Sequence, residues 1–100
     1  MEEPKLVIWR KRALKQVGEI LDYYQNEFSL QAADNLVAAI EETVLKASKY
    51  PTIGQLSAKK KGVRSRIVKD HYRLYYTVKG KNLFVVAFYD MRQHPSKRKY

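Results

Sequence analysis

Residues 63–89 have the sequence VRSRIVKDHYRLYYTVKGKNLFVVAFY. Within this segment, residues 63–69 and 72–78 alternate between apolar and polar side chains, the pattern of a strand with one buried face. Residues 83–89 are apolar at every position, as expected of a central strand covered on both faces. Lys79-Gly80-Lys81-Asn82 has the composition of a hairpin turn. The segment therefore predicts three consecutive strands.

The residues before this segment predict one strand and two helices. Residues 6–9, LVIW, form a short apolar run after a proline and indicate a first strand. Apolar residues at helical spacing follow, first in residues 13–24 and again in residues 33–47. Ser29 is suited to cap the second helix, because its hydroxyl can accept an early backbone N–H. The short connection makes the two helices an antiparallel hairpin.

Together these elements predict an α+β fold. We expect an N-terminal strand, then a two-helix antiparallel hairpin packed on a mostly antiparallel four-stranded sheet. The chain of 100 residues is long enough for a single domain over residues 1–100. Residues 91–100 are polar and basic, and we expect them to form a flexible tail.

Composition excludes several classes of site. The chain has no cysteine and two histidines, so we expect neither a disulfide nor a metal site, and no motif indicates a cofactor. The longest apolar run, residues 83–89, is far too short to cross a membrane. The first residues, Met-Glu-Glu-Pro-Lys, lack the apolar stretch of a signal peptide. We therefore expect a cytoplasmic protein that does not bind membranes.

Positive charge is concentrated in the second half of the chain. Residues 1–50 contain 7 Lys and Arg and 8 Asp and Glu, a net charge of −1, whereas residues 51–100 contain 13 and 2, a net charge of +11. Such a concentration favours nucleic acid or an acidic protein as a partner. The loop residues Lys59, Lys60 and Lys61 belong to this basic region. The alternative is that these side chains only solvate the surface.

The register of the first hairpin decides where its arginines lie. If Asp70-His71 is a tight turn, Ile67 pairs with Leu74 and Arg66 pairs with Tyr75. The apolar side chains would then face the helices, and the opposite, open face would carry Arg64, Arg66, Arg73 and Tyr75. A shift of one residue would put Arg73 beside Ile67 on a mixed face, which burial disfavours.

Arg92 and His94 follow the predicted central strand. Residues 89–95 read YDMRQHP, so a loop at the strand end can bring both side chains to the open face. Arginine binds phosphate with two charge-assisted hydrogen bonds, and histidine titrates near neutral pH. This segment indicates a phosphate site, and the alternative is a solvated basic tail.

The ordered set of elements resembles the RelE/ParE superfamily of bacterial type II toxins. The resemblance runs from about Leu6 to His94 and includes the Pro51-Thr52-Ile53-Gly54 turn, the arginine-containing strands and Arg92. It implies a toxin that is neutralised by a cognate antitoxin, whose acidic and apolar segment wraps the toxin and masks its basic face.

The superfamily contains two activities. The RelE-like branch is implied to cleave messenger RNA on the ribosome, by attack of the 2′-hydroxyl on the adjacent phosphate. The matching positions imply that Arg73 and Arg92 are catalytic and that Arg64 and Arg66 bind RNA, and His94 is near enough to be the catalytic acid or base. We also expect Lys59, Lys60, Lys61 and Tyr75 to bind RNA, with cross-strand packing as the alternative role of Tyr75. Arg98 falls where some members have a tyrosine, and Tyr100 lies close to that position.

The ParE-like branch is implied to poison DNA gyrase without chemistry of its own. The long helical hairpin and the Pro51-x-x-Gly54 turn favour this branch, whereas the arginines and His94 favour the ribonuclease. We expect messenger RNA cleavage, with gyrase poisoning as the alternative. A non-toxic nucleic-acid-binding module is a third possibility.

Overall fold

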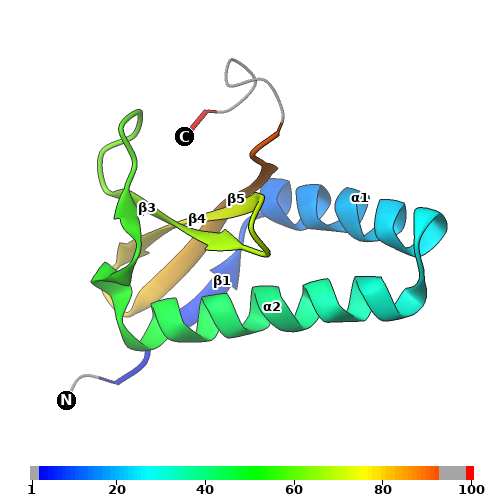
Figure 1. The fold of residues 1–100 in the computed structure, drawn as a ribbon. Helices are drawn as coiled ribbons and strands as arrows, with labels where there is room; N and C mark the ends of the chain where they lie inside the picture. Colours follow the sequence, from blue (N-terminus) through cyan, green and yellow to red (C-terminus); the bar gives the residue numbers. More distant parts are fainter. Residues whose placement is uncertain (1–2, 93–98) are drawn as a thin grey trace.

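A computed structural model describes residues 3–92 and 99–100. The helices lie side by side as one layer and cover one face of a mixed sheet (Figure 1). Along the chain the elements are β1 (Leu6–Trp9), α1 (Lys11–Glu27), α2 (Leu30–Lys49), the 3₁₀ turn η1 (Pro51–Ile53), β2 (Gln55–Leu56), β3 (Val63–Val68), β4 (Tyr72–Lys79) and β5 (Asn82–Asp90). The predicted α+β fold is confirmed.

The sheet has the strand order β1-β5-β4-β3-β2. β1 runs parallel to β5, and the other neighbours are antiparallel. The central position predicted for residues 83–89 is confirmed, since β5 lies between β1 and β4. The sheet has five strands rather than the expected four, because Gln55 and Leu56 pair with β3. Two residues are too few to show a strand period.

The helical layer buries the main core against the sheet. α1 contributes Ala13, and α2 contributes a buried stripe; these residues pack on the helix-facing side chains of β3, β4 and β5. The α2 residues of the core are Leu36, Ile40, Val44 and Ala47. The predicted cap is confirmed, because the Ala32 N–H donates to Ser29 Oγ over 3.0 Å.

The predicted register of the β3–β4 hairpin is wrong by one residue. Val68 pairs with Tyr72, and Ile67 pairs with Arg73. The loop has three residues rather than two, because Lys69 and Asp70 both adopt left-handed backbone angles, with φ of 52° and 65°. In this register both Val68 and Tyr72 are buried. The Ile67 side chain, in contrast, lies on the open face and remains 56% exposed. The burial of Tyr72 outweighs that of Ile67.

The true register separates the arginines. Arg64 and Arg66 pair with Tyr76 and Leu74, so they lie on the helix-facing side of the sheet. Arg73 lies on the open face, where Tyr75 belongs to a separate apolar cluster. The prediction that all these residues share the open face is therefore wrong. Arg64 and Arg66 are tolerated on the covered face because β3 lies near the sheet edge, where long side chains reach solvent.

No helix within residues 3–92 and 99–100 is long and apolar enough to cross a membrane. Most of the expected tail, residues 91–100, lies outside the described residues. His94 is among those outside them.

Candidate functional site

The open face of the sheet carries a second apolar cluster, in which Tyr75 is central. Its ring centroid lies 5.9 Å from that of Tyr89 and 5.5 Å from that of Tyr100. Tyr100 is held at this face because Ser57 Oγ donates to its backbone carbonyl over 2.9 Å. The cluster comprises Val63, Tyr75, Phe84, Val86, Ala87, Tyr89 and Tyr100. Tyr75 and Tyr89 are each only 5% exposed, whereas Tyr100 is partly exposed and presents a tyrosine ring at this face.

Arg73 stands at the border of this cluster, toward β2. Its Nη1 donates to Ser65 Oγ over 2.9 Å and to Gln55 Oε1 over 3.3 Å. These two bonds orient the guanidinium beside a small depression of about 190 Å³, which Arg73, Tyr75 and Tyr100 help to line. A cation and two tyrosine rings therefore meet at one place on the open face.

A larger depression on the same face is bordered by four basic side chains, of which only Lys61 was expected from the sequence. It has a volume of about 420 Å³, and its basic residues are Arg10, Arg12, Lys61 and Lys79. The Arg10 guanidinium lies 4.6 Å from the centroid of the Phe84 ring. Arg12 Nη2 donates to the Tyr89 hydroxyl over 3.2 Å. Parallel pairing of β1 with β5 brings these arginines here, and periodicity alone does not reveal that pairing.

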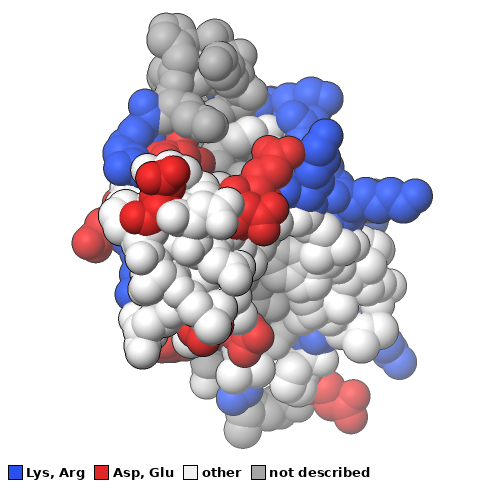
Figure 2. All heavy atoms as spheres, turned by 90° about the vertical axis from the view of Figure 1, so that its right-hand side faces the viewer, with Lys and Arg blue, Asp and Glu red and all other residues white. Residues whose placement is uncertain are grey.

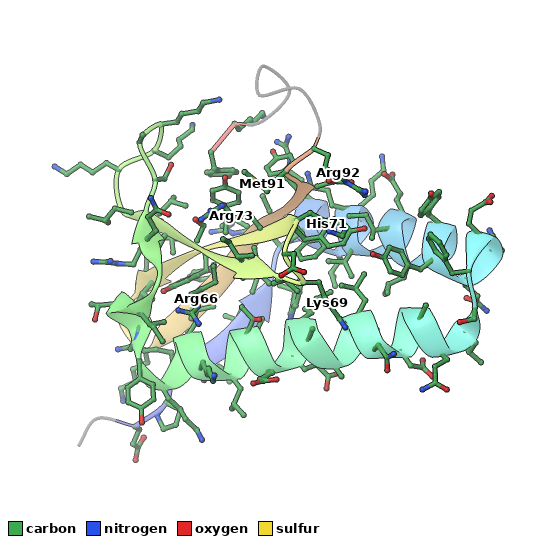
Figure 3. The ribbon with its side chains drawn as sticks, in the orientation of Figure 1. Arg66, Lys69, His71, Arg73, Met91 and Arg92 are labelled. Atoms are coloured by element: carbon green, nitrogen blue, oxygen red, sulfur yellow. The ribbon has the colours of Figure 1, made fainter. Side chains whose placement is uncertain are left out.

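Arg64 has a structural role on the helix-facing side. Its Nη1 donates to the carbonyl oxygens of Gly54, over 2.8 Å, and Thr52, over 3.2 Å. These hydrogen bonds attach the turn that follows α2 to strand β3. Arg66 lies on the same side, toward α2, whereas Arg73 lies on the opposite side (Figure 3). Arg66 Nε is buried and has no hydrogen-bond partner among the described residues.

Arg92 lies at the far end of β5 and is paired with Asp90. Its Nη2 donates to Asp90 Oδ2 over 2.7 Å, and its Nε donates to Oδ1 over 3.0 Å. The hydrogen bond from Arg92 holds the pKa of the Asp90 carboxyl below its ordinary value, and the same pairing raises the pKa of Arg92. Arg92 thus makes a bidentate, charge-assisted contact with a carboxylate two residues earlier in the chain.

Two tyrosines, Tyr24 and Tyr72, lie close to the Asp90–Arg92 pair. The Tyr72 hydroxyl donates to the Tyr24 hydroxyl over 3.1 Å, and the His71 ring centroid lies 4.4 Å from that of Tyr72. Burial, and then the bond to Tyr24, raise the pKa of the Tyr72 phenol. Tyr72 is therefore a neutral hydrogen-bond donor at neutral pH.

The loop lysines differ in their surroundings. The backbone N–H groups of Lys59 and Lys60 each donate to Ser57 Oγ over 3.2 Å, which shapes the loop. Only Lys61 of the three lines the 420 Å³ depression. In the described part of the chain, His, Cys, Asp and Glu side chains nowhere gather in threes as a metal site requires. The structure thus brings Arg73 and Tyr75 together and separates them from Arg64, Arg66 and Arg92.

Comparison with known proteins gives both a family and a fold. The family model described as ParE toxin of type II toxin-antitoxin system, parDE, matches residues 7–95. A structure of the chromosomal ParDE TA system from P. aeruginosa superposes with a TM-score of 0.73 at 20% identity, covering 86% of this chain and 95% of that one. The YoeB/ParE toxin from Agrobacterium tumefaciens superposes with a TM-score of 0.62 at 18% identity, covering 85% of this chain and 96% of that one. A search of curated proteins found no match to the sequence.

The fold and the family match define a toxin of the RelE/ParE superfamily. Within that class, the chain belongs to the ParE toxin family of type II toxin–antitoxin systems. Membership of this family implies a cognate antitoxin as partner.

Proposed function

We propose that this toxin inhibits growth by binding DNA gyrase, as the ParE-like branch is implied to do, and that it needs no catalytic residues for this. The observation that carries the proposal is the separation of the arginines. Arg64 and Arg66 lie on one face of the sheet, and Arg73 lies on the other. The family match to ParE toxins supports the same choice.

Cleavage of RNA makes a stricter geometric demand. A base, an acid for the leaving oxygen and cations for the charged transition state must converge on one phosphate. Of the four expected arginines, Arg64 is bound to backbone carbonyl oxygens of the turn after α2, and Arg92 is paired with the Asp90 carboxylate. A binding activity makes no such demand, since it needs only complementary surfaces.

The cognate antitoxin would bind the open face. That face combines the tyrosine cluster around Tyr75 with the basic border of Arg10, Arg12, Lys61 and Lys79. An acidic segment with apolar side chains is complementary to both features.

A supercoiling assay tests the proposal. Purified toxin should inhibit supercoiling by gyrase, and addition of the antitoxin should restore it. The same toxin should leave messenger RNA intact in a translating extract. Cut messenger RNA together with unaffected supercoiling would sink the proposal.

Messenger RNA cleavage is the second candidate, and one observation favours it. Arg73 and the partly exposed Tyr100 line a single depression, so a cation and a phenol group lie together on the open face. In that case Arg73→Ala should lower the cutting rate by about 100-fold, as loss of a transition-state cation does. Lys79→Ala, which removes a cation bordering the other depression, should lower it only slightly.

A further inference from the structure

Negative charge is concentrated in one part of this basic protein. Residues 16–45 contain six Asp and Glu and no Lys or Arg, whereas the rest of the chain contains all 20 Lys and Arg and only four acidic residues. This segment forms most of α1 and α2, including their joined ends. The joined ends project beyond the sheet (Figure 1). Charge is therefore separated in this toxin, with an acidic helical tip and a basic remainder.

The charges of α1 oppose the stability of the helix. A helix favours acidic residues in its first turn and basic residues in its last. α1 has neither; it begins with Lys11 and Arg12, and its C-terminal half carries Glu19, Asp22 and Glu27. Within the described residues none of these three carboxylates forms an ion pair. Charges that break a local stability rule without a structural partner are expected at functional surfaces.

The tip also exposes large apolar side chains. Tyr23, Phe28 and Leu30 are 53%, 65% and 60% exposed. We call these three residues the tip patch. Asp22, Glu27 and Asp34 are exposed close to them in sequence, at the ends of the same helices. Figure 2 looks onto this end of the molecule and shows Asp and Glu around an uncharged surface, with most Lys and Arg toward the sides of the view.

The tip patch is anchored to the core by a chain of rings. The Phe28 ring centroid lies 5.9 Å from that of Tyr23 and 5.4 Å from that of Tyr24. Tyr24 is hydrogen-bonded to Tyr72, which stacks on the buried Phe88. Aromatic side chains that are held in place before binding lose little conformational entropy, and such residues dominate binding energies.

We infer that the tip patch and its acidic border are the surface by which this toxin binds gyrase. The inference rests on the proposed function and names the surface that performs it. The surface on gyrase would be an apolar patch bordered by Lys and Arg. An enzyme that holds DNA must present such cations, because it neutralises phosphates. The carboxylates of the acidic border would contact gyrase Lys and Arg side chains of the kind that otherwise bind DNA phosphates.

Charge complementarity assigns the toxin's two surfaces to different partners. An acidic antitoxin segment is attracted to the basic open face and repelled by the acidic tip. A partner with basic residues around an apolar patch has the opposite preference.

Charge reversal at the tip provides the first arm of the test. Asp22→Lys with Glu27→Lys places cations near the C-terminal end of α1, so this variant should fold and should melt at a higher temperature than the unmodified toxin. It should nevertheless need at least about tenfold more protein for half-inhibition of supercoiling, a loss expected of contacts at a binding surface. The matched control, Glu41→Lys with Glu42→Lys, adds the same charge on α2 away from the tip and should inhibit like the unmodified toxin.

Removal of an apolar side chain provides the second arm. Tyr23→Ser and Leu45→Ser each shorten a helical side chain that is 53% exposed. Only Tyr23→Ser should weaken gyrase inhibition, and both variants should still bind the antitoxin. Inhibition by both tip variants at the unmodified level would overturn the tip assignment and leave the proposed function standing.

Two other results would also overturn the assignment. Loss of antitoxin binding alone in the tip variants would make the tip an antitoxin surface. Dissociation of a toxin dimer by the same variants, with inhibition unchanged, would make it a contact between two copies. A lack of gyrase inhibition by the unmodified toxin would instead overturn the proposed function itself.

Discussion

Tyr76 shows how a single polar group inside the core fixes the chain around it. Its hydroxyl donates to the Pro51 carbonyl over 2.7 Å and accepts from the Gly54 N–H over 3.0 Å. Burial raises the pKa of this phenol, so it stays neutral and can do both. Arg64 binds the Gly54 carbonyl from the same side. The turn between α2 and β2 is thus held at both its N–H and its carbonyl groups.

Gly54→Ala should destabilise the protein by about 2 kcal/mol, because overpacking and loss of a buried hydrogen bond act together. The new Cβ would lie 2.6 Å from the Tyr76 hydroxyl, although the backbone φ of −75° suits alanine. Urea unfolding measures the change. Gly18→Ala is the control: Gly18 lies within α1 with nothing within 4 Å of the added Cβ, so it should stabilise by about 0.5–1 kcal/mol. Equal effects of the two changes would contradict this explanation.

At the scale of the elements, the two helices begin differently. The first residue before α2, Ser29, caps it with a side-chain hydrogen bond, whereas Arg10 provides no side-chain cap for α1. α1 is also the helix whose charges oppose its dipole. Its stability must therefore come from packing, in which Ala13, Val17 and Ile20 contact the core.

Ser29→Ala should destabilise the protein by about 1 kcal/mol, because it removes the acceptor for an otherwise unpaired N–H at the start of α2. Thermal unfolding followed by far-UV circular dichroism measures the loss. Ser29→Asp restores an acceptor and adds a favourable charge at a helix N-terminus, so it should retain the original stability. A loss as large in Ser29→Asp as in Ser29→Ala would show that the hydroxyl acts in another way.

At the scale of the whole molecule, charge is separated between the sheet and the helical tip. The net charge of +10 understates the repulsion, because residues 16–45 carry no cation and the basic residues crowd into the rest of the chain. Such self-repulsion destabilises a compact state. The same distribution of charge gives the toxin two surfaces of opposite sign, the basic open face of the sheet and the acidic helical tip.

Added salt should therefore stabilise the free toxin. Raising the salt concentration from 0.05 to 0.3 M screens the repulsion, and the melting temperature should rise by about 5 °C, which corresponds to roughly 1 kcal/mol for a domain of this size. Differential scanning calorimetry measures it. The variant Lys59→Gln with Lys60→Gln, which removes two cations from the basic half, should show a smaller rise. A melting temperature that falls with salt would mean that attractive pairs such as Asp90–Arg92 outweigh the repulsion.

Most of the fold and little of the site geometry could be predicted from the sequence. Hydrophobic period separates helices from strands, and the continuous apolar run of residues 83–89 correctly predicts a strand in the interior of the sheet. The two-residue strand β2 has no period to read. Arg73 and Tyr75 were correctly assigned to the open face, whereas Arg10 and Arg12 were missed because they come from a distant part of the sequence.

The sequence by itself determined the order and type of the main elements, the cap at Ser29 and the separation of charge, because these depend on local spacing and composition. Only the tertiary structure decided which face each arginine occupies. Two registers of the β3–β4 hairpin differ by one residue, and that difference moves every side chain of a strand to the other face. The choice depends on a loop with two left-handed residues and on burial of Tyr72 between Tyr24 and Phe88, which are distant in the chain.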